Sequence, residues 1–310
     1  MDNTQYDFGS PDNQNENNND LINNTVEETN GQTQMNDESS HPNIPKDDAP
    51  IVVFVGPPQS GKSMILKCLA DYLYNVEENC VIQANRELFG TDEKYQADCD
   101  AFEKIIGDRN IKMSNTVDFL LVDLVQKNSG TILAHFLEAP GEDFFSFKDP
   151  DNEPEKGFRG YLNSIAETNT KSKNKRKVVY VILLDYYKGS PFKRDPKLRE
   201  KYIKKMENLY DDKVKNHHAE VILLYNKADL SGSIPNKWAN CGGVSNQKEI
   251  EKEARTQYEE LFFKEKFIFL SFEVVQFLPF CSGRYADDPP YTAPDESYPE
   301  ALWKAIKKSW

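Results

Sequence analysis

The feature that most constrains the fold of this chain is the segment Ile51–Ser63, with the sequence IVVFVGPPQSGKS. Its first five residues are apolar and mostly β-branched, which predicts a fully buried strand. The strand runs directly into Gly56, and Gly61, Lys62 and Ser63 complete the spacing G-x-x-x-x-G-K-S of a phosphate-binding loop. An ordinary glycine and proline turn between a strand and a helix is the alternative, and the complete spacing in this context favours the phosphate site.

Each residue type in this loop has a physical role in binding a nucleotide phosphate. The two glycines let the backbone curl, so that successive N–H groups form an anion-sized nest at the positive end of the helix that begins near Lys62. We expect the Lys62 ammonium to reach the β- and γ-phosphates of a nucleotide, and the Ser63 hydroxyl to ligate Mg²⁺. The candidate nucleotide-binding positions of the loop are Gly56, Gln59, Ser60, Gly61, Lys62, Ser63 and Met64.

The acidic residues of the chain are concentrated near its start. Residues 1–50 hold eleven Asp and Glu against the single Lys46, a net charge of −10, which leaves −3 of the formal −13 for residues 51–310. This balance argues against a general nucleic-acid or anionic-membrane binder. Because residues 1–48 are rich in Asn, Asp and Glu and poor in apolar groups, we expect a disordered tail there and one P-loop domain over residues 49–310.

Cysteine usage and targeting signals predict a cytoplasmic location. The five cysteines are an odd number without C-x-x-C spacing, which suits a reducing compartment better than a disulfide framework or a zinc site. The chain shows no secretory leader, no run of about eighteen apolar residues and no lipidation motif. We therefore expect no intrinsic membrane anchor.

Further apolar runs predict the rest of the sheet. Residues 116–126 and 131–138 flank a tight turn at Lys127–Gly130, so these two strands must be antiparallel. The other strands are expected at residues 51–55, 178–185, 220–225 and 267–272, with helices between them. The pattern predicts an α/β fold with a mostly parallel six-stranded sheet and one antiparallel strand at its edge.

Three stretches are longer than such a domain needs, and we expect insertions at about residues 75–115, 142–160 and 230–247. Within the first of them, residues 91–106 have helix-forming composition, with Tyr95, Cys99 and Phe102 on one apolar face.

A second motif, Asn226-Lys227-Ala228-Asp229, directly follows the strand at residues 220–225. A carboxylate at Asp229 can accept hydrogen bonds from the N1–H and the exocyclic amino group of guanine together. Adenine lacks this pair of donors, so the mismatch would leave buried polar groups unpaired and favour guanine. The alternative is that these residues only cap a helix or a turn.

The order of elements and the positions of the two motifs resemble the Ras-like small GTPases and the wider translation-factor-related class of P-loop GTPases. The resemblance covers about residues 51–310. It implies a three-layer P-loop nucleotide hydrolase of Ras-like topology, with GTP or GDP as ligand and Mg²⁺ as cofactor. It also implies that Asn226 contacts the purine and ties its loop to the phosphate loop, while the Lys227 stem lies along the base.

The same resemblance implies a γ-phosphate sensor at residues 138–141, where the family has D-x-x-G. Gly141 matches this motif, whereas Glu138 replaces the Asp that holds Mg²⁺ through water. Glu142 stands where many members place the Gln that orients the attacking water. A carboxylate beside the γ-phosphate is repelled, so we expect slow hydrolysis or hydrolysis that uses another residue.

Three other positions follow from the resemblance. The Thr that ligates Mg²⁺ in the GTP state maps to Thr116, with Ser114 as the alternative. The last base-contact loop maps to Ser271 and Phe272, at the end of the strand expected at residues 267–272. The candidates for an internal arginine finger are Arg86, Arg109 and Arg159.

Together these features predict a GTP-binding molecular switch that hydrolyses GTP to GDP and phosphate. A guanine-nucleotide-binding scaffold with little hydrolysis and a P-loop ATPase or small-molecule kinase are the alternatives. We expect a protein effector or regulator as partner, with a second GTPase as one candidate. The surface of this chain that binds such a partner would include the aromatic residues Phe144, Phe145 and Phe147.

Overall fold

The computed structural model describes residues 48–57, 60–76, 79–107, 120–138, 176–185, 189–209, 219–230, 247–262, 264–267, 270–273, 275–285, 291–292 and 294–309. The chain divides between residues 39 and 40 into two units, and every described residue lies in the second unit, Ser40–Trp310. Residues 1–47 of the expected tail, residues 142–160 and residues 231–246 of the insertion expected at about residues 230–247 lie outside the described residues.

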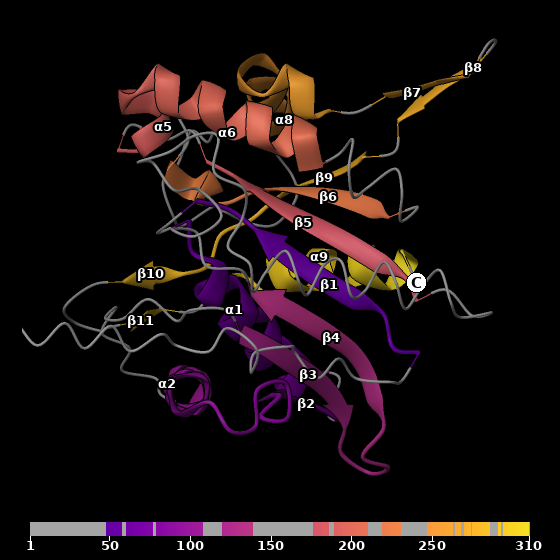
Figure 1. Ribbon diagram of the computed structural model, residues 1–310. Coiled ribbons are helices and arrows are strands. Elements are labelled where there is room, and N and C mark those ends of the chain that lie inside the picture. Colours follow the sequence, from indigo (N-terminus) through magenta and orange to yellow (C-terminus); the bar gives the residue numbers. More distant parts are fainter. Residues whose placement is uncertain are drawn as a thin grey trace, which may run out of the picture. The chain divides into compact units, whose positions relative to one another are not determined.

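The described residues form a central seven-stranded sheet with the order β2-β3-β4-β1-β5-β6-β9 (Figure 1). Neighbouring strands are parallel from β4 to β9, while β3 is antiparallel to both β2 and β4. The predicted α/β fold with a mostly parallel sheet is therefore confirmed. The strands are β1 (Ile51–Val55), β2 (Cys80–Ala84), β3 (Leu120–Gln126), β4 (Ile132–Glu138), β5 (Val178–Leu184), β6 (Glu220–Tyr225) and β9 (Val275–Pro279).

The central strands are apolar along their whole length because both of their faces are covered. All residues of β1 and β5 are buried, as are all but the first residue of β6. Continuous apolar runs of this kind are typical of parallel strands with layers on both sides. These strands form the core, and they carry the loops of interest at their carboxyl ends.

The sheet has one strand more than the sequence predicted. β2 pairs with the outer side of β3, so the antiparallel strand β3 lies inside the sheet and not at its edge. β2 comes from the stretch that we expected to be an insertion. Cys80, Ile82 and Ala84 are buried on one face of β2, whereas Gln83 is exposed. This alternation over five residues is too short to be distinguished from a loop in the sequence alone.

The last strand of the sheet was predicted wrongly. We expected it at residues 267–272, but the strand that pairs with β6 is β9. Residues in the expected position form β7 (Lys264–Phe267) and β8 (Leu270–Glu273), which pair with each other in a separate two-stranded sheet. Residues 267–272 and β9 are both apolar and β-prone, so only long-range pairing with β6 distinguishes them.

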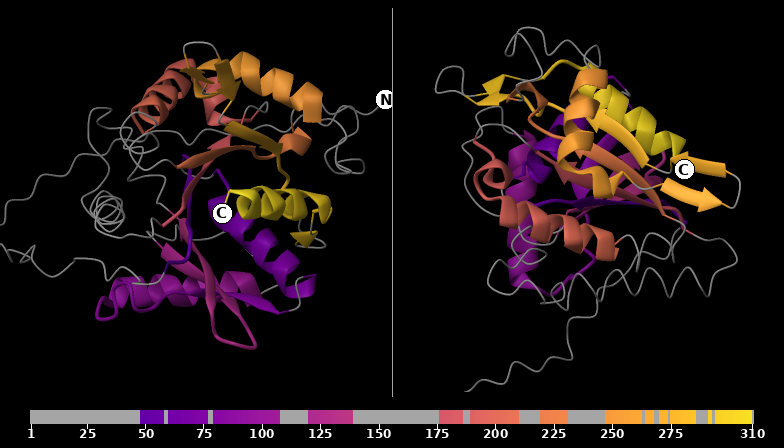
Figure 2. Two further views of the ribbon diagram at one scale, coloured as in Figure 1. Left: turned by 90° about the vertical axis from the view of Figure 1, so that its right-hand side faces the viewer. Right: turned by 90° about the horizontal axis from the view of Figure 1, so that it is seen from above.

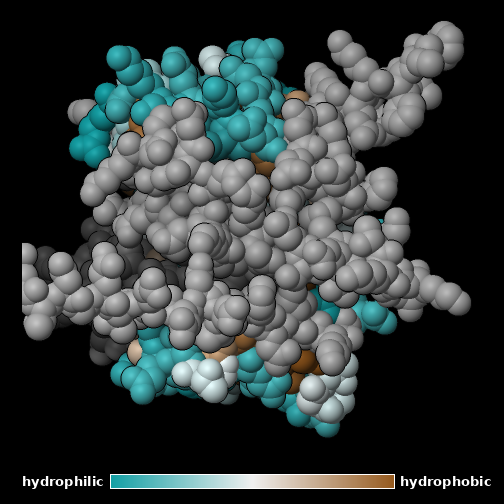
Figure 3. Space-filling model, in the orientation of Figure 1, coloured by the Kyte–Doolittle hydropathy of each residue, from teal (hydrophilic) through white to brown (hydrophobic). Residues whose placement is uncertain are grey.

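Helices α1 (Lys62–Asn75) and α9 (Ser297–Lys308) contact each other, and they lie together on one side of the strands in Figures 1 and 2. Other helices gather at the β6–β9 end, and the surface over α5, α6 and α8 is hydrophilic in Figure 3. They are α5 (Pro191–Arg194), α6 (Pro196–Leu209), η2 (Ala228–Leu230), α8 (Gln247–Gln257) and η4 (Glu259–Leu261). The short strands β10 (Arg284–Tyr285) and β11 (Tyr291–Thr292) pair with each other.

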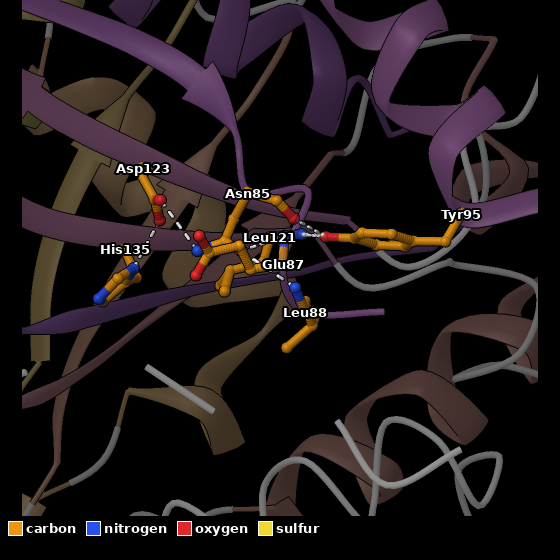
Figure 4. A network of polar contacts seen from close by, with 7 residues as sticks. All are labelled: Asn85, Glu87, Leu88, Tyr95, Leu121, Asp123 and His135. Atoms are coloured by element: carbon orange, nitrogen blue, oxygen red, sulfur yellow. Dashed lines mark hydrogen bonds and ion pairs between the residues drawn. The ribbon is translucent and has the colours of Figure 1, made fainter. Parts of the chain in front are cut away.

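The expected helix at residues 91–106 is present as α2 (Glu93–Gly107), with Tyr95, Cys99 and Phe102 buried as predicted. A buried polar network joins α2 and the end of β2 to strands β3 and β4 (Figure 4). Asp123 of β3 accepts from Asn85 Nδ2 at 2.9 Å and lies 2.7 Å from Nδ1 of His135 in β4. The Tyr95 hydroxyl donates to the carbonyl of Asn85 at 2.7 Å.

Within the described residues, none of the helices is long and apolar enough to cross a membrane. Four of the five cysteines lie in these residues, and all four are buried and outside any disulfide: Cys68, Cys80, Cys99 and Cys281.

Candidate functional site

Two polar loops follow β1 and β6, and the topology brings them to the same edge of the sheet. β5 lies between these two strands and is parallel to both. Because the carboxyl ends of parallel strands meet at one edge, the loop after β1 and the loop after β6 both open there. These are the segments that the sequence singled out, residues 56–63 and 226–229.

The glycines of the first loop are required by close contacts. Gly61 precedes α1 with φ of 90°, a left-handed conformation that side chains with Cβ rarely adopt. A Cβ on Gly61 would also lie 2.8 Å from Nδ2 of Asn226. A Cβ on Gly56 would lie 2.7 Å from Oγ of Ser60 and 2.9 Å from Cβ of Leu183. Any other residue at these positions would push the loop away from β5 and β6.

Lys62 is buried at the start of α1, and its ammonium donates hydrogen bonds to the backbone of its own loop. Nζ donates to the carbonyls of Gly56 at 3.1 Å and Pro57 at 3.2 Å. A buried ammonium is costly unless its donors are satisfied. The Lys62 charge therefore lies where an anion bound at the α1 N-terminus would meet it.

Ser63 and Glu138 form the polar pair beside Lys62. Ser63 Oγ donates to Glu138 Oε1 at 2.6 Å, and the Ser63 N–H also donates to this carboxylate. Burial raises the pKa of Glu138, while the charge of Lys62 and the hydrogen bonds from Ser63 act in the opposite direction. Glu138 Oε2 is buried and has no hydrogen-bond partner within the described residues.

This pair fits a hard divalent cation. Hydroxyl and carboxylate oxygens are the ligands that Mg²⁺ prefers, and it usually takes one or two from protein and the rest from water or phosphate. The orphaned Oε2 atom would gain a partner from such an ion or from its water shell. The described residues hold no cluster of three or more His, Cys, Asp and Glu that could bind a metal without further ligands.

Asn226 physically joins the two loops. Its Nδ2 donates to the carbonyl of Ser60 at 2.6 Å, and its backbone N–H donates to the carbonyl of Leu184 at 2.8 Å. Its Oδ1 is buried without a hydrogen-bond partner within the described residues. The tie between the loop after β6 and the phosphate loop, which the resemblance implied, is thus present in the geometry.

Asp229 lies in the 3₁₀ helix η2 and faces the segment that follows β9. The Ala228 N–H donates to the Phe280 carbonyl at 3.0 Å, and the Cys281 thiol donates to the Asp229 carboxylate. Cys68 of α1 donates its own thiol to the Ser282 carbonyl at 3.2 Å. Burial raises the pKa of Asp229, and the hydrogen bond from Cys281 is the largest effect that opposes it.

These contacts correct the expected position of the last loop. Ser271 and Phe272 lie in β8, within the separate two-stranded sheet, whereas residues 280–282 follow the strand next to β6. Sequence reasoning missed Cys281 because it placed the last strand of the sheet at residues 267–272 and not at β9. The signal that could have found it is the alternation of Val275, Phe277 and Pro279 just before Phe280.

The structure brings Lys62, Ser63 and Glu138 together, and it joins Asn226 to Ser60. Met64 is buried inside α1. Arg86 lies beside α2 and pairs with Asp100 and Glu103, each at 2.7 Å, so its guanidinium is engaged away from the site. The other predicted positions lie outside the described residues: Gln59, Arg109, Ser114, Thr116, Gly141, Glu142, Phe144, Phe145, Phe147 and Arg159.

No protein family and no curated protein matches this sequence significantly. Similar solved structures include the signal recognition particle receptor SRb-GTP/SRX complex from Chaetomium thermophilum, at 15% identity, covering 84% of this chain and 98% of that chain, with a TM-score of 0.38. The S. cerevisiae Ski7 GTPase-like domain, bound to GTP, is 15% identical over 87% of this chain and 51% of that chain, with a TM-score of 0.35.

The septin GTPase domain from Chlamydomonas reinhardtii is 13% identical over 77% of this chain and 67% of that chain, with a TM-score of 0.34. At such identities and scores these likenesses carry no argument about the site. The functional assignment below rests on the contacts between the two loops.

Proposed function

We propose that this protein binds guanine nucleotides and hydrolyses GTP to GDP and phosphate with Mg²⁺. The observation that supports this most directly is the hydrogen bond from Asn226 Nδ2 to the Ser60 carbonyl at 2.6 Å. It joins a loop suited to phosphates to a loop suited to a purine, so that one nucleotide can contact both.

The base would be selected by Asp229. Its ionised carboxylate can accept two parallel donors from the guanine edge, and the thiol of Cys281 favours the ionised form. Adenine offers no such pair and would leave the carboxylate unsatisfied. The free Oδ1 of Asn226 is a further buried acceptor at the same place.

The phosphates would lie at the N-terminus of α1. There the Lys62 ammonium would exchange its bonds to the Gly56 and Pro57 carbonyls for bonds to phosphate oxygens. Ser63 and Glu138 would hold Mg²⁺, which when bound bridges phosphate oxygens and neutralises developing charge. Thr116 and Gly141 would respond to the γ-phosphate, and Glu142 would make turnover slow.

The test is calorimetric titration of the nucleotide-free protein with GDP, a non-hydrolysable GTP analogue and ATP in the presence of Mg²⁺. We expect micromolar or tighter binding of both guanine nucleotides and none of ATP. Asp229→Ala should abolish this binding, and Asp100→Asn, which changes an exposed carboxylate on α2, should leave it unchanged. Equal binding of ATP would favour an ATPase or a kinase instead.

A guanine-nucleotide-binding scaffold with little turnover is the second candidate. The carboxylates of Glu138 and Glu142, which replace the Asp and the Gln of the resembled family, favour it, because they mark two positions where the chemistry of hydrolysis would be lost. Single-turnover hydrolysis of bound GTP separates the two functions. Formation of GDP within minutes supports a GTPase, whereas GTP that stays intact for hours supports a scaffold.

A further inference from the structure

Asp185 is a buried acidic residue that neither motif includes, and it lies between the two loops of the site. It directly follows β5, the strand that separates β1 from β6. Only 4% of Asp185 is exposed to solvent. An acidic side chain is rarely buried to this extent unless it is paired, so its partners indicate its role.

Two of these partners hold Asp185 from the helical side. The Ser190 hydroxyl donates to Asp185 Oδ1, and the same hydroxyl accepts from the Phe192 N–H at the start of α5. The Tyr258 hydroxyl donates to the Asp185 carbonyl at 2.6 Å. Ser190 and Tyr258 are fully buried. Asp185 therefore has a fixed backbone and one fixed carboxylate oxygen.

The other carboxylate oxygen faces the loop after β6. Asp185 Oδ2 lies 3.8 Å from Nζ of Lys227. Lys227 has a φ of 56°, the left-handed region that a lysine seldom adopts and that costs energy to maintain. Asn226 and Asp229 lie on either side of it in the same loop. An ion pair to a rigid carboxylate stabilises this conformation.

Two contacts of Asp185 favour its carboxylate form against the effect of burial. Burial raises the pKa of Asp185, and the hydrogen bond from Ser190 and the charge of Lys227 both favour the carboxylate. Within the described residues, Lys227 is the only cation within 4 Å of the Asp185 carboxylate.

We propose that Asp185 is a positioning residue for guanine recognition. Its carboxylate holds Lys227 so that residues 226–229 keep the conformation that presents Asn226 and Asp229 to the base. The inference rests on the proposed function. Asp185 itself does not touch the nucleotide in this arrangement; it acts through Lys227.

The first measurement is the GDP affinity of the full-length Asp185→Asn protein by calorimetry. The amide keeps an oxygen that can accept from Ser190 but removes the charge that faces Lys227. Because the loop must then be ordered by the nucleotide alone, we expect GDP binding about tenfold weaker than in the wild type. Asp100→Asn, which removes an exposed ion pair to Arg86, is the matched control and should change the affinity less than twofold.

A double-mutant cycle separates positioning from a general structural role. We expect Lys227→Met to weaken GDP binding and Asp185→Asn to add less than about twofold in that background. An additive effect would mean that Asp185 acts through α5 and the fold, and would overturn the proposal. If Asp185→Asn does not fold, the same cycle with Ser190→Ala applies, with a smaller expected coupling of the same sign.

The two proposals fail in different ways. A wild-type protein that does not bind GDP would remove the proposed function. Wild-type binding that Asp229→Ala abolishes but Asp185→Asn leaves intact would remove only the role of Asp185.

Discussion

At the scale of residues, the site depends on carboxylates whose burial opposes their charge. Glu138, Asp185 and Asp229 all have a raised pKa because they are buried. In each case neighbouring hydrogen-bond donors or a lysine oppose this rise. Ser63 donates to Glu138, Ser190 to Asp185 and Cys281 to Asp229. Each of these donors therefore controls how readily its carboxylate is ionised.

Cys281 gives a test at this scale. Cys281→Ala removes the donor that opposes the effect of burial, so the pKa of Asp229 should rise further. Only the ionised carboxylate accepts from guanine, so GDP affinity is lost as pH falls through this pKa. The loss should begin at a higher pH in Cys281→Ala than in the wild type.

The measurement is the GDP dissociation constant as a function of pH for both proteins, because the ionisation of the nucleotide itself cancels in the comparison. Cys281→Ser keeps a donor and should follow the wild-type curve. Identical curves for wild type and Cys281→Ala would show that the thiol does not control Asp229.

At the scale of elements, β2 and α2 form an addition to the sheet that is held by buried polar contacts as well as by apolar packing. Asp123 lies in β3, His135 lies in β4, and Asn85 directly follows β2. All three residues are buried. Figure 4 shows the Asp123 carboxylate between the other two side chains. When one member of such a network is removed, the other buried polar groups lose a hydrogen-bond partner, and the cost of their desolvation is no longer offset.

Asp123→Ala should therefore lower the free energy of unfolding by about 3 kcal/mol, whereas Asp123→Asn, which keeps an acceptor, should cost about half as much. Urea unfolding followed by circular dichroism measures both. Asp100→Asn on the exposed side of α2 should stay within about 0.5 kcal/mol of the wild type. A loss below 1 kcal/mol for Asp123→Ala would mean that apolar packing alone holds β2 and α2.

At the scale of the whole molecule, a ligand that binds only the folded protein stabilises all of its elements together. GDP at about 100 times its dissociation constant should add about 2.7 kcal/mol to the free energy of unfolding. For a domain of this size, the increase corresponds to a Tm about 5–10 °C higher. Differential scanning calorimetry with GDP and Mg²⁺ measures the shift. ATP at the same concentration, or GDP with the Asp229→Ala protein, should give none, and an equal shift with ATP would contradict guanine selectivity.

Both motifs of the candidate site could be predicted from the sequence because each is encoded locally. The strand before Gly56 and the strand before Asn226 are short buried runs, and the residues that follow them have side chains suited to phosphates and to a purine. The predicted link between Asn226 and the phosphate loop has its counterpart in the bond to Ser60.

The amino-acid sequence alone thus determined the mostly parallel α/β fold, because buried parallel strands and glycine-containing loops have local patterns. Only the tertiary structure decided that β2 extends the sheet, that β9 and not residues 267–272 pairs with β6, and that Cys281 and Asp185 lie beside the base loop. These facts depend on contacts between residues far apart in the chain. Strand pairing and side-chain proximity of that kind have no local pattern in the sequence.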